Sequence, residues 1–158
     1  LVDSAIANVR ELSQLLRPVI LDDFGLDASL RWLTERFAQR TGVRVDYVSS
    51  FSERLKDESE THLFRIAQEA FTNIARHSGA TEVRVQLRSD NQQVFLSIED
   101  NGRGLSRDDQ ANTLSLGMTG MRARARQVGG VLQTSKPVGG GLKIDVTIPK
   151  QVPEETHG

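Results

Sequence analysis

The chain has 158 residues, of which 37% are hydrophobic and 26% are charged, and its formal net charge is −1. This composition fits one globular domain with a small appendage, and the near-neutral charge provides no bulk attraction for nucleic acid or an anionic membrane. The chain contains no cysteine, which excludes a disulfide framework, a thiolate zinc site and a cysteine nucleophile. No apolar run reaches the roughly 18 residues that a membrane-spanning helix needs, and no signal peptide is visible.

The first segment of the chain carries apolar residues at helical spacing. Val2, Ala5, Val9, Leu12 and Leu16 follow one another at intervals of three or four residues, which predicts a helix over residues 1–17 with one apolar stripe. Such a stripe packs either on the helix's own domain or in a bundle between subunits, and five positions do not decide between the two. Because the chain starts with Leu1, already inside the pattern, we interpret it as a piece of a longer protein.

A connector is expected after this helix, over residues 18–25. Pro18 disfavours helical conformation in the residue before it, and Gly25 gives the segment the flexibility of a joint. Helical spacing returns over residues 26–41. Gly42 is well placed as the stop of that helix.

The rest of the chain alternates between helical and strand-like patterns. Helices are predicted at residues 58–77 and 117–128, and strands at residues 43–48, 82–88, 93–100, 131–135 and 142–148. A turn-like Asp-Asn pair joins the second and third strands, which predicts an antiparallel hairpin. Helices on one face of a mixed, mostly antiparallel sheet make a two-layer α/β sandwich of the α+β class. We expect this domain to cover residues 26–150, followed by a frayed tail over residues 151–158.

The helix predicted at residues 58–77 carries Glu69 and Asn73 four positions apart. Residues at this spacing share one face of a helix. An amide oxygen on that face can hold a hard divalent cation against phosphate groups. The alternative is that both residues are polar members of an exposed helix face.

A second motif, Asp100-Asn101-Gly102-Arg103-Gly104, follows directly after a strand. A carboxylate that ends a buried strand can accept a hydrogen bond from an exocyclic amine such as that of adenine. The two glycines would let the backbone approach a flat ring or a phosphate closely. A tight hairpin turn would give the same pattern, since such turns are common.

A third motif is the glycine cluster at residues 115–121, Ser-Leu-Gly-Met-Thr-Gly-Met. Gly117 and Gly120 are expected to open a helix whose first N–H groups form an anion site. Helix-start glycines without a ligand are the alternative. The polar residues 105–116 that precede them are expected to form a mobile lid.

The order and spacing of these motifs resemble the Bergerat-fold ATPase superfamily, which includes histidine kinases, type II topoisomerases, Hsp90 and MutL. Within it, residues 69–80 (EAFTNIARHSGA) and 116–125 (LGMTGMRARA) are very similar to bacterial sensor histidine kinases that pair with LuxR/NarL-type response regulators. The segment around Leu16-Arg17-Pro18 also resembles the joint between the second dimerisation helix and the ATPase domain of that family. Residues 1–17 are therefore expected to be a remnant of that helix.

The resemblance implies a role for each matching residue. Asn73 would be the ligand of a Mg²⁺ ion that bridges the ATP phosphates, and Glu69 is the acidic residue that opens the same motif. Asp100 would bind the adenine amine. Further nucleotide contacts are implied for Gly102 and Gly104 beside the base, for Arg76 and His77 near the phosphates, and for Leu116, Gly117, Met118 and Gly120 where the lid meets its helix. ATP and Mg²⁺ are the expected cofactors.

Two departures from the family pattern affect these expectations. Leu142 stands where the family usually has a threonine that supports adenine recognition. The phosphoacceptor histidine of the family lies on a preceding dimerisation helix, and none of His62, His77 and His157 occupies such a place. We therefore expect this chain to bind ATP without phosphorylating itself.

The expected function is that of the ATP-binding catalytic domain of a sensor histidine kinase, which transfers the γ-phosphate of ATP to a histidine on a dimerisation helix outside this chain. The expected partners are that helix, in a homodimer of the full-length kinase, and a response regulator of LuxR/NarL type, with no direct contact to nucleic acid. We expect a cytoplasmic domain, with any membrane anchor in regions outside this chain.

Two alternatives from other classes stay open. One is a different Bergerat-fold ATPase, in which Glu69 would act as the general base for water, or a serine kinase of the anti-sigma type. The other is a degenerate module that binds partners and no longer binds nucleotide. Leu142 favours the degenerate module, and the intact Asn73 and Asp100 argue against it.

Overall fold

The computed structural model describes residues 18–105 and 113–154, with the side chains of residues 18–105 and 116–154. The predicted helix over residues 1–17, most of the predicted lid and the end of the tail lie outside the described residues. Five strands form one sheet: β1 (Arg44–Ser49), β2 (Glu82–Ser89), β3 (Gln93–Asp100), β4 (Val131–Ser135) and β5 (Leu142–Pro149). The five predicted strands are thus confirmed, with ends that differ by one residue at most.

The strand order in the sheet is β1-β2-β3-β5-β4. β1 pairs with β2 in parallel, whereas β2 with β3, β3 with β5, and β4 with β5 are antiparallel. The predicted hairpin is the β2–β3 pair, in which Val83 lies opposite Asp100. The same register places Asp100 opposite Leu142 of β5, so that the second motif and the start of the last strand meet at one edge of the sheet.

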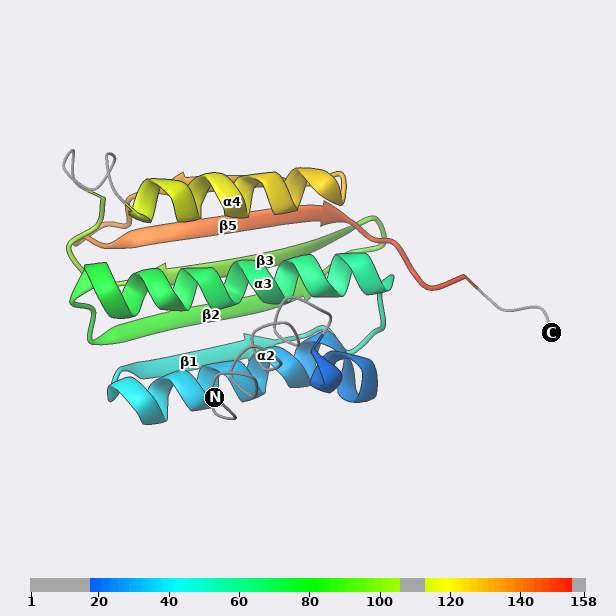
Figure 1. Cartoon of the computed structure of the whole chain (residues 1–158), viewed down its shortest axis with the longest axis horizontal. Helices are drawn as coiled ribbons and strands as arrows, with labels where there is room; N and C mark the ends of the chain where they lie inside the picture. The colour runs from blue at the N-terminus through cyan, green and yellow to red at the C-terminus, as the bar shows by residue number, and fades with distance from the viewer. Residues whose placement is uncertain (1–17, 106–112, 155–158) are drawn as a thin grey trace, which may run out of the picture.

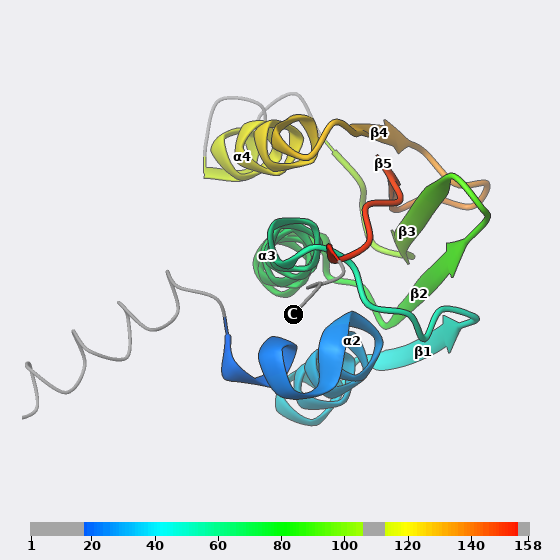
Figure 2. The same ribbon diagram turned by 90° about the vertical axis from the view of Figure 1, so that its right-hand side faces the viewer.

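The helices are α2 (Val19–Thr41), α3 (Asp57–Asn73), the π-helix η1 (Ile74–Ser78) and α4 (Thr113–Gln127). All three α-helices cover the same face of the sheet, with α3 between α2 and α4 (Figures 1 and 2). This arrangement confirms the two-layer sandwich that the sequence predicts. The helices in the described part of the chain are too short or too polar to cross a membrane.

The core lies between the helices and the sheet. Along β2, buried and exposed residues alternate, because successive side chains of a strand point to opposite faces. The predicted core face of the helix at residues 58–77, which is α3 continued by η1, is confirmed, since its residues are all buried: Leu63, Ile66, Ala67, Ala70, Phe71 and Ile74. The helix that bears Glu69 and Asn73 is therefore held firmly by its apolar face, and its opposite face remains for other contacts.

The start of α2 differs from the predicted connector. α2 begins at Val19 directly after Pro18, because a proline with its fixed φ suits the start of a helix as well as it disrupts a helix interior. The break comes instead at Gly25, whose φ of 80° and ψ of −176° are not helical. Gly42 ends the helix in the left-handed conformation with φ 74°, as predicted.

An ion pair ties this first turn of α2 to the rest of the domain. The guanidinium of Arg54 donates from Nη2 to the backbone oxygen of Leu21 at 3.0 Å and from Nε to Oε2 of Glu60 at 3.1 Å. Glu60 is completely buried, and its carboxylate also accepts the backbone N–H of Leu55. The segment before Gly25 is therefore fixed to the N-terminal turn of α3.

The start of α4 also differs from the prediction. The helix begins at Thr113, whereas the sequence predicts a start at Gly117, because glycine is unfavourable inside a helix. Burial of Met118 and Met121 in the core outweighs that local preference. Gly117 and Gly120 therefore lie in the second and third turns, and the orphan N–H groups of the helix belong to the residues before Gly117.

Candidate functional site

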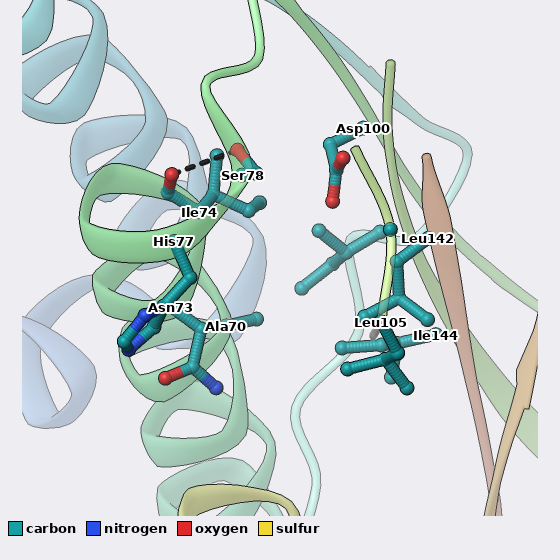
Figure 3. A pocket seen from close by; sticks show the side chains of 11 residues that line it. Ala70, Asn73, Ile74, His77, Ser78, Asp100, Leu105, Leu142 and Ile144 are labelled. Carbon is teal, nitrogen blue, oxygen red and sulfur yellow. Dashed lines mark hydrogen bonds between the residues drawn. The ribbon is translucent and has the colours of Figure 1, made fainter. Parts of the chain in front are cut away.

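One pocket lies between the end of α3 and the ends of β3 and β5. Its walls are mostly apolar, and its lining residues are Ala70, Asn73, Ile74, His77, Ser78, Ile98, Asp100, Gly104, Leu105, Leu142 and Ile144. Figure 3 shows the helical residues on one side of this pocket and Asp100, Leu142 and Ile144 on the other. Four residues predicted from separate motifs, Asn73, His77, Asp100 and Gly104, thus line a single cavity.

Asp100 supplies the buried carboxylate of the pocket. It is the last residue of β3 and is only 5% exposed. Oδ1 accepts the backbone N–H of Gly102 at 2.8 Å, and the backbone N–H of Leu142 donates to the same carboxylate. Burial raises the pKa of Asp100, while these two hydrogen bonds lower it. The carboxylate is thus oriented by two backbone donors and can accept a further donor from a ligand in the pocket.

The turn after Asp100 packs directly against η1. The backbone N–H of Arg103 donates to the carbonyl of Ser78 at 2.9 Å, and the α-carbon of Gly102 lies so close to this carbonyl that a side chain there would overlap it. Gly104 has a φ of +73°, a conformation that favours glycine. Gly102 is therefore required by its close approach to Ser78, and Gly104 is required by its backbone conformation. The sequence alone predicts that these glycines serve a ligand or a hairpin turn.

Asn73 lies at the junction between α3 and η1 and has an orphaned polar group. The residue is 8% exposed, and its Nδ2 has no hydrogen-bond partner among the described residues. A buried amide group without a partner is costly. Asn73 lines the pocket, and a side-chain amide that is not fully used in the fold suits a ligand or a metal ion, so this residue fits the predicted role.

Glu69 lies one turn before Asn73 and meets α4. The α-carbon of Gly117 lies against Oε1 of Glu69, and a Cβ at Gly117 would stand 3.4 Å from Nδ2 of Asn73. The first and third motifs of the sequence are therefore in contact, although 44 residues separate Asn73 from Gly117. Among the described residues no group of three or more His, Cys, Asp or Glu side chains could hold a metal by itself.

The structure places the other predicted site residues less centrally. Arg76 is exposed on η1 and does not line the pocket. Met118 is buried in the core, so a ligand could reach only its backbone. Leu116 and Gly120 line a second hollow between the helices, together with Glu69 and Gly117. Leu116, Gly117 and Gly120 thus line this second hollow and not the pocket that contains Asp100.

Sequence reasoning missed two contributions to the site. Ser78 lines the pocket and ends η1, and its Oγ donates to the carbonyl of Ile74 at 2.8 Å. Leu142, singled out only as a departure, lines the pocket and binds Asp100 through its backbone N–H. Any residue except proline could make this second contact, so the side chain at this position carries no signal for it.

The comparisons with known sequences point to one family. The profile of the histidine kinase-, DNA gyrase B- and HSP90-like ATPases matches residues 58–152. The sensor histidine kinase MctS of Rhizobium johnstonii is 42% identical over 135 residues, which cover 83% of this chain and 29% of MctS. The oxygen sensor histidine kinase NreB of Staphylococcus carnosus is 34% identical over 145 residues, which cover 91% of this chain and 42% of NreB. The chain spans less than half the length of these relatives.

Solved structures show the same fold. The histidine kinase domain of a blue-light activated histidine kinase from Erythrobacter litoralis gives a TM-score of 0.63 at 25% identity, over 79% of this chain and 61% of that one. The ATP binding domain of PrrB from Mycobacterium tuberculosis gives a TM-score of 0.62 at 23% identity, over 82% of this chain and 92% of that one. This second match is a likeness of fold alone. From the profile match and the two kinase relatives, the chain belongs to the histidine kinase-, DNA gyrase B- and HSP90-like ATPase family, as an ATP-binding domain of the histidine kinase type.

Proposed function

We propose that this chain is the catalytic domain of a sensor histidine kinase and that its pocket binds ATP with the adenine against Asp100. The observation that carries the proposal is a buried, oriented carboxylate in a mostly apolar pocket. A flat ring suits the apolar walls of Ile98, Leu142 and Ile144. An exocyclic amine would supply the donor that the Asp100 carboxylate can still accept.

The phosphates of ATP would extend from this pocket toward Asn73 and Glu69. Asn73 would hold Mg²⁺ through its amide oxygen, with His77 beside it in the pocket and Arg76 on the same turn. When bound, Mg²⁺ would neutralise charge on the phosphates, as in phosphoryl transfer generally. Glu69, whose carboxylate lies against Gly117, would face the terminal phosphate from the next turn of α3.

In the proposed reaction an imidazole nitrogen of an acceptor histidine attacks the γ-phosphorus. The bond from that phosphorus to the β–γ bridging oxygen breaks, ADP leaves with the electron pair, and the imidazole gives up its N–H proton. The chain contributes mainly position and electrostatic stabilisation, which dominate catalysis of phosphoryl transfer. We place the acceptor histidine on a dimerisation helix, and we assign a response regulator of LuxR/NarL type as the next recipient of the phosphoryl group.

The binding step is tested by calorimetric titration of ATP into the chain, with and without Mg²⁺. We expect saturable binding that Mg²⁺ strengthens and that Asp100→Ala weakens by at least about tenfold, since a buried partner is lost. Asp145→Ala is the matched control, because this carboxylate lies half-exposed on β5 outside the pocket. Equal affinity in the wild-type chain and the Asp100→Ala variant would contradict the proposed adenine contact.

The transfer step needs a separate test with an acceptor. The chain, radiolabelled ATP and a protein that supplies a dimerisation helix with its histidine are mixed, and acid-labile phosphate on the acceptor is counted. Label on the acceptor that is lost with Asn73→Ala supports the kinase assignment. Release of inorganic phosphate at the same rate with and without the acceptor would favour an ATPase in which Glu69 activates water.

A further inference from the structure

Asp100 ends β3, and the residue after it holds that end of the strand to β2 through its side chain. Asn101 makes one ladder bond through its backbone, from its N–H to the carbonyl of Glu82 at 3.2 Å. Two residues paired in this way in an antiparallel ladder exchange a second bond in the opposite direction. Here the backbone N–H of Glu82 donates instead to Oδ1 of the Asn101 side chain at 3.0 Å. The side chain of Asn101 thus takes the place of a backbone acceptor where β3 leaves the sheet.

Asn101 uses both ends of its side-chain amide for this attachment. Oδ1 also accepts the backbone N–H of Thr81 at 2.9 Å, and Nδ2 donates to Oγ1 of Thr81 at 2.9 Å. The carbonyl of Thr81 in turn accepts the backbone N–H of Arg44, the first residue of β1, at 3.0 Å. We call the three side-chain bonds from Asn101 to Thr81 and Glu82 the Asn101 clamp. It fixes the end of β3 to the point where β2 begins beside β1.

The turn that follows the Asn101 clamp orients the carboxylate of the pocket. The backbone N–H of Gly102 donates to Oδ1 of Asp100 at 2.8 Å, and the backbone N–H of Arg103 donates to the carbonyl of Ser78 at the end of η1. Gly102 therefore lies between two attachments, one to the start of β2 and one to η1. Because both attachments restrict this turn, the N–H of Gly102 stays where it can bind Asp100.

Three ordinary explanations for an asparagine do not apply at position 101. The residue is exposed, so it is no part of the core. Its φ is not positive, so the backbone there does not need the left-handed conformation that asparagine tolerates. It does not line the pocket, so a ligand in the pocket would not touch it. The function of its side chain is therefore to hold the turn.

We infer that Asn101 is a positioning residue of the nucleotide site, which acts through Gly102 on the direction of the Asp100 carboxylate. The strength of a hydrogen bond depends on direction as well as on distance, so a carboxylate that is free to turn would bind the adenine amine less well. A binding group that is already held in place also loses less conformational entropy when its ligand arrives. This inference rests on the proposed function, because it names what aligns the carboxylate assigned there to adenine.

The first test is calorimetric titration of ATP, with Mg²⁺, into the 158-residue chain and its Asn101→Ala and Asn101→Asp variants. Alanine removes the Asn101 clamp at an exposed position without backbone strain, and we expect the affinity for ATP to fall about fivefold or more. Aspartate can still accept both backbone N–H groups and can accept the Thr81 hydroxyl, so the affinity should return to within about twofold of the wild-type value. An equal loss in both variants would overturn the inference.

Asp90→Ala is the matched control for lost stability. Asp90 lies at the other end of the same hairpin, and its Oδ1 likewise accepts two backbone N–H groups, those of Gln92 and Gln93, at 2.8 and 2.7 Å. Urea denaturation should show that both alanine variants are less stable than the wild-type chain. Only Asn101→Ala should lose affinity for ATP, while Asp90→Ala should stay within about twofold of the wild-type value. Equal losses of affinity would mean that the stability of the hairpin is the cause and would overturn the inference.

A double-mutant cycle tests whether Asn101 acts through Asp100. In the Asp100→Ala background, Asn101→Ala should change the affinity for ATP by less than about twofold, because the carboxylate that it positions is absent. Inosine triphosphate carries a carbonyl in place of the adenine amine, so the preference of the chain for ATP over inosine triphosphate should also fall in Asn101→Ala. Additive losses in the cycle, or an unchanged preference, would overturn the inference.

Amide hydrogen exchange, measured by NMR, reads the same contact without nucleotide. The N–H of Gly102 should exchange faster in Asn101→Ala than in the wild-type chain, and at an unchanged rate in Asp90→Ala. Unchanged exchange of Gly102 in Asn101→Ala would overturn the inference. If ATP binding requires Asp100 but not Asn101, only the positioning inference fails. If ATP does not bind the wild-type chain, the proposed function fails, and the positioning of Asp100 for adenine fails with it.

Discussion

Gly117 of α4 lies so close to the carboxylate of Glu69 on α3 that a Cβ at position 117 would overlap Oε1. This contact brings the two helices together beside Asn73, whose Nδ2 would stand 3.4 Å from a Cβ at position 117. The glycine therefore determines where the Glu69 carboxylate can lie relative to Asn73. A larger residue at position 117 would push the Glu69 carboxylate away from Asn73. The core would stay intact, because the group that must move is the end of the flexible Glu69 side chain.

Substitution of the two glycines of α4 by alanine should have different effects on stability. Gly120→Ala places its Cβ where no atom lies within 4 Å, so we expect it to raise the free energy of unfolding by about 0.5–1 kcal/mol, the difference in helix propensity. Gly117→Ala should give a smaller gain or none, because Oε1 of Glu69 must move away. Urea denaturation of both variants measures the difference, and equal gains would show that Glu69 does not constrain position 117.

Asp100→Asn should stabilise the protein at neutral pH while weakening nucleotide binding. Burial raises the pKa of Asp100 above its ordinary value of 3.8, so the folded state disfavours the ionised carboxylate relative to the unfolded state. The contribution of Asp100 to stability is therefore full below about pH 3.8 and is lost as the pH rises through the folded-state pKa. A neutral asparagine avoids this loss, and its amide oxygen can still accept the backbone N–H of Gly102.

The measurement is thermal unfolding of the wild-type chain and the Asp100→Asn variant between pH 7 and pH 4. We expect the variant to melt at a higher temperature at pH 7 and the difference to narrow as the pH falls. ATP titration of the same samples should show weaker binding by the variant. A difference in melting temperature that is constant with pH would mean that the ionisation of Asp100 is not the cause.

Arg54→Ala should destabilise the domain strongly. Removal of this partner leaves the fully buried Glu60 carboxylate without its guanidinium and removes the hydrogen bond from Arg54 to the carbonyl of Leu21. Because the Arg54 side chain is 43% exposed, we expect a loss of about 2–3 kcal/mol, somewhat less than for a fully buried pair. Arg44→Ala is the control, since its pair with Asp46 is exposed on both sides and should contribute less than about 1 kcal/mol. Similar losses in chemical denaturation would refute the role assigned to Glu60 burial.

A comparison of Gly139→Ala with Gly141→Ala distinguishes the stability cost of backbone strain from the cost of a steric overlap. Both glycines have a positive φ, 95° and 98°, so each substitution should cost about 1–2 kcal/mol for conformation alone. A Cβ at Gly141 would also overlap the carbonyl oxygen of Asp100, whereas a Cβ at Gly139 meets no atom within 4 Å. We expect Gly141→Ala to cost at least about 1–3 kcal/mol more and to weaken ATP binding. If denaturation finds equal costs, the contact between Gly141 and Asp100 is looser than described.

Most of the fold could be predicted because local pattern and tertiary structure agree. The alternation of Val83, Val85 and Leu87 predicts a strand with one buried face, and in the structure that face lies in the core between the sheet and the helices. The same holds for Asp100, which the sequence places at the end of a strand and the structure buries at that point. Apolar patterns of period two or 3.6 predict strands and helices reliably, because each element must turn one apolar face to the core.

The predicted elements differ from those of the structure where a tertiary contact outweighs a local preference. Pro18 starts a helix that the sequence interprets as a connector, and the helix continues to Gly25 because Arg54 binds the carbonyl of Leu21. α4 begins before Gly117 because the burial of Met118 and Met121 offsets the cost of glycine. The hollow between α2, α3 and α4 could not be predicted either, since its residues come from three helices that only the fold brings together.

The position of β5 has a consequence for synthesis on the ribosome. β5 is the last strand in sequence, yet it lies between β3 and β4 in the sheet. Until residues 142–149 leave the exit tunnel, β4 has no neighbouring strand in the described sheet and β3 ends in an open edge. The nascent chain therefore cannot complete this sheet before β5 has been translated, and a premature stop codon before β5 would leave an exposed edge prone to aggregation.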